Sequence, residues 1–154
     1  PAIDRVAMGG DPEAIAFPRA IMSEGYDFSF SGLKTAVVNH VRKDPDAATE
    51  DVAASFQEAV VDALTTKVRR AARDHGAKGI VLAGGVAANS CLRRCLSEAA
   101  AKQQVTLSIP PLVLCTDNAA MIAAAGYFIH AAGRVDALSL DAVPYLELAG
   151  LADH

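Results

Sequence analysis

The chain has 154 residues, of which 52% are apolar, and this composition supports a packed core and excludes a disordered tail. Aromatic residues make up only 5% and Trp is absent, which favours alanine-rich helical packing over a β-sandwich. The formal net charge of −4 argues against nucleic-acid binding through the overall field of the protein. We therefore interpret the two local basic clusters as solvated helix faces. These clusters are Lys67, Arg69, Arg70 and Arg73, and then Arg93 and Arg94.

The cysteines and the hydropathy pattern indicate a cytoplasmic protein without membrane spans. Cys91 and Cys95 lie four residues apart and so share one helix face, but no second pair at zinc-ligand spacing accompanies them. We expect reduced thiols. Neither a signal peptide nor an apolar run of membrane-spanning length is visible. The chain begins at Pro1 rather than at Met, which fits a fragment of a longer protein.

The first part of the chain is predicted to lead into helices. Residues 1–30 contain several Gly and Pro residues and fit a short helix with an irregular connection. At residues 26–30 apolar and polar side chains alternate, which predicts a strand. Helical character then runs from Ser31 to Arg42.

A long helix is the clearest element of the pattern. It can begin at Asp44-Pro45 or at Thr49, and Gly76 ends it. Apolar residues recur along it at spacings of three and four, which predicts one core-facing stripe. The stripe consists of Val52, Phe56, Ala59, Val60, Ala63, Leu64, Val68 and Ala71.

Strand and helix alternate in the rest of the chain. The expected elements are a strand at 79–83, a helix at 89–104, a strand at 105–109 and a helix at 117–132 that Gly133 caps. We expect the tail after Arg134 to be irregular. This order predicts an α/β lobe, rich in helix and with a small sheet.

Two loops could carry chemistry, because each follows a strand and precedes a helix. In the first, Gly84 and Gly85 would let a ligand approach the backbone, and the helix that begins near Asn89 would offer free N–H groups to an anion. An ordinary tight turn with Asn89 as helix cap explains the same residues. In the second loop, Asp117 is either a helix cap or a carboxylate ligand for a metal. Asp4 could be a surface or capping residue.

Three long motifs resemble those of the tRNA N6-adenosine threonylcarbamoyltransferase family. The first is residues 27–35 (Asp-Phe-Ser-Phe-Ser-Gly-Leu-Lys-Thr), the second is residues 82–89 (Leu-Ala-Gly-Gly-Val-Ala-Ala-Asn), and the third is residues 115–123 (Cys-Thr-Asp-Asn-Ala-Ala-Met-Ile-Ala). Residues 17–19 (Phe-Pro-Arg) and 139–144 fit as well. The family was formerly described as O-sialoglycoprotein endopeptidases.

The resemblance implies an actin-like ATPase fold of the ribonuclease H-like kind (ASKHA), with two lobes around a cleft. It implies transfer of a threonylcarbamoyl group from threonylcarbamoyl-adenylate to N6 of the tRNA adenosine beside the anticodon (t6A biosynthesis). By resemblance, Asn89 contacts the nucleotide beside the Gly84-Gly85 turn, Asp4 binds near the ribose, and Asp117 is a ligand of a divalent metal, Fe²⁺ or Zn²⁺.

The resemblance also identifies what this chain lacks. The family's His-x-x-x-His metal pair and its first-lobe glycine loop are absent, so the chain corresponds to the C-terminal half. We expect residues 1–30 to connect to the N-terminal lobe, and residues 31–154 to form the C-terminal actin-like lobe. The implied partners are tRNA, the N-terminal lobe, a noncatalytic paralogue and an ATPase subunit. We expect the isolated half to be inactive. Two alternatives are a metalloendopeptidase and a nucleotide-binding or interaction module without catalysis.

Overall fold

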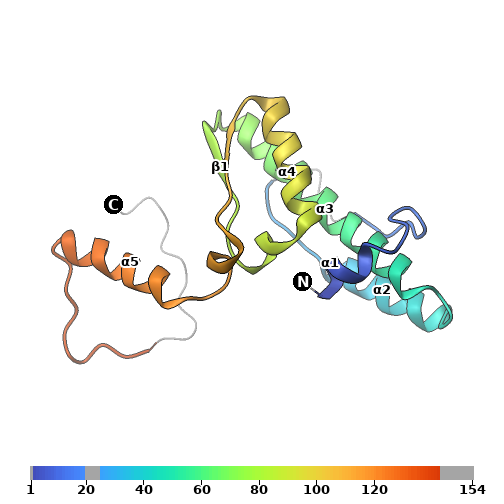
Figure 1. Ribbon diagram of the computed structural model, residues 1–154, viewed down its shortest axis with the longest axis horizontal. Helices are drawn as coiled ribbons and strands as arrows, with labels where there is room; N and C mark the ends of the chain where they lie inside the picture. Colours follow the sequence, from blue (N-terminus) through green and yellow to red (C-terminus); the bar gives the residue numbers. More distant parts are fainter. Residues whose placement is uncertain (1, 20–24, 143–154) are drawn as a thin grey trace. The chain divides into compact units, whose positions relative to one another are not determined.

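The computed structural model describes residues 2–19 and 25–142. The chain divides into two compact units, Pro1–Asp117 and Asn118–His154. The first unit is rich in helix and contains a small sheet (Figure 1), whereas the second contains α5 (Ala119–Ala131). The expected boundary near residue 30 concerns the connection to another lobe and stays a prediction.

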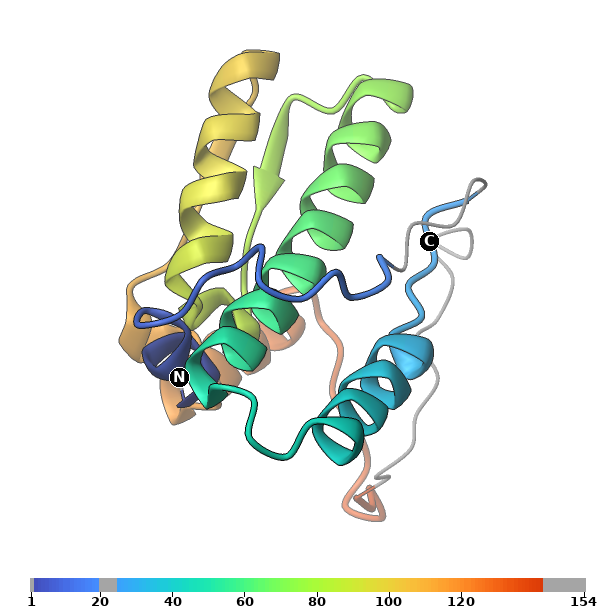
Figure 2. The same cartoon turned by 90° about the vertical axis from the view of Figure 1, so that its right-hand side faces the viewer.

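A single long helix, α3 (Thr49–Asp74), organises the first unit. It begins at Thr49, one of the two predicted starts, and Gly76 follows it in the left-handed conformation with φ of 57°. Three other helices surround it: α1 (Ala2–Ala7), α2 (Ser31–Lys43) and α4 (Ser90–Gln103). Figure 2 shows α4 alongside α3.

Two hydrophobic clusters lie on different sides of α3. Phe17 and Leu33 pack against Ala59 in one cluster. Val61 packs against Leu92 and Leu96 of α4 in the other. The predicted stripe is therefore confirmed, but it is only part of a wider apolar surface. The helix is buried from two directions, which one stripe cannot provide.

The sheet consists of two short parallel strands, β1 (Gly79–Val81) and β2 (Thr106–Ser108). Gly79 pairs with Thr106 and Val81 pairs with Ser108, and α4 forms the crossover between the strands. Because the strands are parallel, the loops that follow them leave the sheet at the same edge. The Asn89 loop and the Asp117 loop therefore leave the sheet at one edge. The predicted helix-rich α/β architecture with a small sheet is confirmed.

The strand predicted at residues 26–30 is wrong. Among the described residues this segment has no strand partner, and its alternating aromatic side chains pack instead on one another and on cations of α3. The rings of Phe28 and Phe30 stack with centroids 6.1 Å apart. Lys67 lies 5.2 Å above the Phe28 ring and its Nζ donates to the carbonyl oxygen of Asp27. An extended segment on a helix has the same two-residue alternation as a strand.

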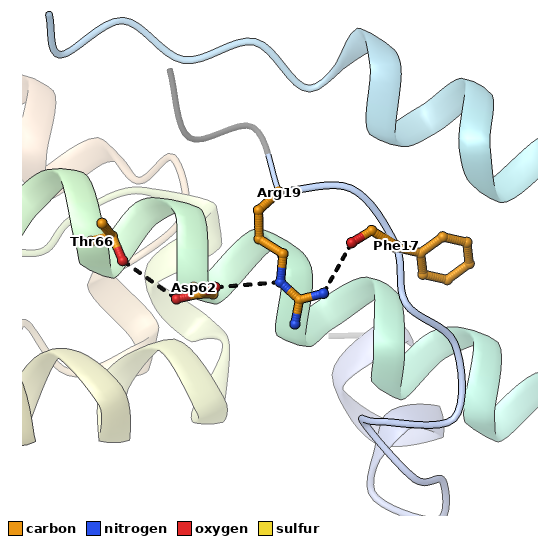
Figure 3. A network of polar contacts seen from close by, with 4 residues as sticks. All are labelled: Phe17, Arg19, Asp62 and Thr66. Carbon is orange, nitrogen blue, oxygen red and sulfur yellow. Dashed lines mark hydrogen bonds and ion pairs between the residues drawn. The ribbon is translucent and has the colours of Figure 1, made fainter. Parts of the chain in front are cut away.

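The segment that precedes the gap in the described residues is also fixed to α3. Arg19 Nε lies 3.3 Å from Asp62 Oδ2, and Arg19 Nη1 donates to the carbonyl oxygen of Phe17 at 3.0 Å (Figure 3). Thr66 Oγ1 donates to the other oxygen of Asp62 at 3.4 Å. The ion pair is partly exposed, so it orients the chain more than it stabilises it. The buried Phe17 ring supplies the apolar contact.

Helix α1 is held against the start of α3 by a close backbone approach. A Cβ atom on Gly10 would lie 2.0 Å from the carbonyl oxygen of Glu50, so only glycine fits there. Asp11 N then donates to Asp51 Oδ1 at 2.8 Å. The buried Ser55 hydroxyl accepts from Ile15 N at 3.1 Å. These contacts fix the position of α1, and with it the position of Asp4.

Candidate functional site

Asn89 occupies the junction between the glycine turn and α4. Its Oδ1 accepts a hydrogen bond from Leu92 N at 2.8 Å, so Asn89 is the N-cap of the helix. This contact fixes which side-chain atom is oxygen, and Nδ2 therefore donates to Gln57 Oε1 at 2.7 Å. One N–H of the amide and one lone pair of Oδ1 remain for a ligand. Asn89 therefore caps the helix and still has one N–H and one lone pair available to bind a ligand.

Asp4 of α1 contacts the same end of α4 from a distant part of the sequence. The carboxylate is buried, and it accepts from Ser90 N at 3.1 Å and from Ser90 Oγ at 2.9 Å. A negative charge is favoured at a helix N-terminus, so this contact stabilises the position of α1 beside the start of α4. The expectation of free N–H groups at this end is wrong for Ser90 and Leu92, whose N–H groups bond to Asp4 and Asn89.

A cavity of about 240 Å³ opens beside these side chains. Asp4, Gln57 and Asn89 supply its polar groups, and apolar side chains of α1, α3, η1 (Gly85–Ala88) and α4 line the rest. A second cavity of about 400 Å³ shares Asp4 and Gln57 with the first and includes Ser90 and Arg94. The first cavity, which is apolar with a few convergent polar groups, is typical of a small-molecule site.

The two glycines of the turn differ in what they require. Gly84 has φ of 82° and ψ of 177°, a conformation that only glycine adopts without strain. Gly85 has no positive φ, and a Cβ built on it would meet nothing within 4 Å. A Cβ on Gly84 would also meet nothing within 4 Å, so it is the backbone conformation and not a lack of space that requires glycine there. At Gly85, the folded chain by itself leaves room for a side chain.

Asp117 is not the cap of the helix that follows it. Helix α5 begins at Ala119, and its N-cap is Asn118, whose Oδ1 accepts from Met121 N at 2.9 Å. Asp117 is exposed, and within the described part of the chain it makes no hydrogen bond or ion pair. Its carboxylate is free to bind a ligand that comes from outside this chain.

The thiols form no disulfide, since Cys91, Cys95 and Cys115 are all free. Cys91 lines the second cavity, and Cys95 packs in the cluster between α3 and α4. Burial, and then the neighbouring Cys91 thiol, raise the pKa of Cys95 to about 11 from its ordinary value of 9.0. Cys95 is therefore a neutral packing residue at physiological pH.

Comparison with known proteins identifies the family. The family model described as tRNA N6-adenosine threonylcarbamoyltransferase matches residues 1–124. The chain belongs to this family. Curated relatives with this name include those of Clostridioides difficile (50% identical over 153 residues), Geobacter sp. strain M21 (52% over 155) and Bacillus cereus strain ATCC 10987 (53% over 154). These alignments cover 96%, 98% and 96% of this chain. The chain spans 45% of the length of each relative, and it corresponds to their C-terminal half.

In this member of the threonylcarbamoyltransferase family, the described residues do not make up a metal site by themselves. Asp117 offers an oxygen ligand of the kind that divalent cations accept. Residues 2–19 and 25–142 contain no group of three or more His, Cys, Asp and Glu side chains that could hold a metal ion. By its chemistry, Asp117 fits as one candidate metal ligand. In the same ranges, no helix has the length and apolarity needed to cross a membrane.

Two polar residues of this region were not predicted from the sequence to belong to the site. Gln57 lies inside the apolar stripe of α3, and a lone amide at a core-facing position was the available signal. Arg93 lies four residues after Asn89, which places it on the same face of α4. The interpretation of the basic clusters as solvated faces is wrong for Lys67, Arg70 and Arg93, because their side chains bond to backbone carbonyls of neighbouring segments.

Proposed function

We propose that this chain is the C-terminal half of a tRNA N6-adenosine threonylcarbamoyltransferase. The full-length protein would transfer threonylcarbamoyl from threonylcarbamoyl-adenylate to N6 of the adenosine beside the anticodon. One observation carries the proposal: Asp4, Gln57 and Asn89 converge on one cavity, and the turn that bears Asn89 leaves the sheet at the same edge as the Asp117 loop. The family name of the relatives favours this transfer over peptide hydrolysis or binding alone.

We propose that the adenylate lies against the Gly84-Gly85 turn. Each oxygen of the Asp4 carboxylate keeps a lone pair after bonding to Ser90, and can accept a hydrogen bond from a ribose hydroxyl. Asn89 offers its remaining N–H and lone pair to the same ligand. The absence of a Cβ on Gly85 lets the ligand approach the backbone. These groups bind and orient the adenylate, which lowers the entropic part of the barrier.

Asp117 would hold a divalent metal, Fe²⁺ or Zn²⁺, together with ligands from the N-terminal half. When bound, the metal supplies Lewis-acid polarisation of the carbamoyl carbonyl. The amine nitrogen of the adenosine attacks the carbamoyl carbon, AMP leaves, and the amine loses a proton. No residue of this half is assigned as the acid or base. We propose the actin-like ATPase fold (ASKHA) for the complete two-lobed protein, a cytoplasmic location, and tRNA, a noncatalytic paralogue and an ATPase subunit as partners.

The test compares the full-length protein with residues 1–154 alone. Both are incubated with threonylcarbamoyl-adenylate and unmodified tRNA, and modified adenosine is measured by mass spectrometry of nuclease digests. We expect modification by the full-length protein and none by the isolated half, which circular dichroism should show to be helical. Failure of the full-length protein to modify tRNA, with its paralogue and ATPase subunits present, would contradict the proposal.

A further inference from the structure

The Arg93 side chain contacts both loops that carry candidate site residues. Its Nε donates to the carbonyl oxygen of Ala87, in the turn that ends at Asn89. Its Nη2 donates at 3.1 Å to the carbonyl oxygen of Pro110 and also lies 3.1 Å from Cys115 Sγ, both in the loop that leads to Asp117. One guanidinium thus joins two segments that follow different strands.

The contacts of Arg93 lie where the sheet itself gives little support. The strands pair over three residues each, and both loops continue beyond their ends. Cys115 is buried, and its Sγ lies 3.6 Å from the carbonyl oxygen of Pro111, which closes the second loop around the Arg93 contact. Arg93 therefore supplies contacts between this loop and the turn beyond the ends of the strands.

We propose that Arg93 is a positioning residue, whose guanidinium holds the Asp117 loop against the Asn89 turn and so sets the spacing of these two side chains. This inference rests on the proposed function, because the spacing matters only if both side chains serve one ligand. The planar guanidinium offers several N–H donors in a fixed geometry, whereas an ammonium group cannot span acceptors on two loops in the same way. Arg93 itself touches neither substrate nor metal in this scheme.

The experiment uses the full-length protein with Arg93→Ala, Arg93→Lys and, as a matched control, Arg94→Ala. Arg94 is the next residue of the same helix, its side chain is 66% exposed, and its described contacts are with Cys91 and Glu98. The first measurement is hydrogen exchange of the Leu114 and Cys115 amides, which bond within the second loop to the carbonyls of Pro111 and Leu112. The second is metal affinity by chelator competition, and the third is kcat and KM of tRNA modification.

We expect both loop amides to exchange faster in Arg93→Ala, and metal affinity or kcat/KM to fall by about 10- to 100-fold, the usual cost of losing a residue that orients a ligand. Arg93→Lys keeps the charge but should recover only part of the loss, while Arg94→Ala should stay within about twofold of the unsubstituted protein.

Two outcomes would overturn the inference. In one, loop exchange in Arg93→Ala is unchanged. In the other, exchange rises but metal affinity and kcat/KM fall no more than in Arg94→Ala. If Arg93→Ala does not fold, the Arg93→Lys variant tests the inference instead. Loop exchange, metal affinity and kcat/KM equal to those of the unsubstituted protein would mean that a positive charge alone is sufficient, and would overturn the inference. An unsubstituted protein that modifies no tRNA would instead contradict the proposed function, and loop exchange would still decide whether Arg93 joins the loops.

Discussion

Replacing Asn89 by serine separates its two roles, because serine is as good a helix cap as asparagine but has no amide. The serine hydroxyl can accept from Leu92 N, while the 2.7 Å hydrogen bond to Gln57 is lost. Loss of that partly buried bond should lower the free energy of unfolding by about 1 kcal/mol. Asn89→Ala loses the cap as well, so its free energy of unfolding should fall by about 2 kcal/mol in total.

Nucleotide binding should respond differently from stability. Alanine removes the N–H and the lone pair that Asn89 keeps for a ligand, and the shorter serine hydroxyl cannot place its donor and acceptor where the amide has them. Both variants should therefore weaken binding of an adenine nucleotide by about tenfold or more, which corresponds to roughly 1.4 kcal/mol. Calorimetric titration of full-length protein measures the dissociation constant, and urea unfolding measures stability. Gln57→Ala is a third variant, which removes the partner of the Asn89 amide and one polar group of the cavity while the cap and the Asn89 side chain stay in place.

The reasoning fails if Asn89→Ser binds nucleotide as tightly as the unsubstituted protein. Asn89 would then be a helix cap and nothing more, and the cavity beside it would need another explanation. A fall in affinity that tracks the loss of stability across the three variants would lead to the same conclusion.

Three further predictions follow from neighbouring residues. Asp117→Ala should abolish tRNA modification and weaken metal binding, but it should leave the melting temperature of the metal-free protein unchanged because Asp117 has no partner in the described chain. The control Asp136→Ala, at another exposed carboxylate, should affect neither activity nor metal binding. Full activity and full metal content in Asp117→Asn would refute the assignment. Gly84→Ala should lower the free energy of unfolding by about 1–3 kcal/mol. Gly85→Val should leave urea unfolding nearly unchanged but weaken nucleotide binding. Equal losses of stability in the two variants would contradict this distinction. Burial and then the neighbouring thiol raise the pKa of Cys95 to about 11, so the Cys95 thiol ionises at a lower pH in the unfolded state than in the folded state. The free energy of unfolding should therefore fall as the pH rises from about 9 to about 11. Cys95→Ala should remove this pH dependence in urea unfolding.

The elements of this fold were predictable wherever one physical cause dominated. The glycine after α3 and the apolar run at β1 were sufficient to place those elements within a few residues. Residues 26–30 misled because alternation records which side chains share a face and does not reveal whether the neighbouring element is a strand or a helix.

The candidate site was predictable only in its parts. Family motifs and loop positions selected Asn89 and Asp117, but the hydrogen bonds between Asp4 and Ser90 join residues 86 positions apart. The contact between Gln57 and Asn89 spans 32 positions. Such pairings depend on how helices pack, and neither periodicity nor capping preference contains that information. The last residues of the motif at 139–144 lie outside the described residues.

Helix α3 also determines how local damage spreads through the first unit. Its 26 residues extend over about 39 Å at 1.5 Å per residue, and consecutive positions such as Val60 and Val61 contribute to different hydrophobic clusters. Because α3 contributes to both clusters, unfolding of this helix would expose both clusters to solvent. We therefore expect the unit to unfold as one cooperative block. A substitution that weakens the contacts of Leu33 in α2 should then lower the free energy of unfolding for the whole unit, including the start of α4 where Asn89 lies.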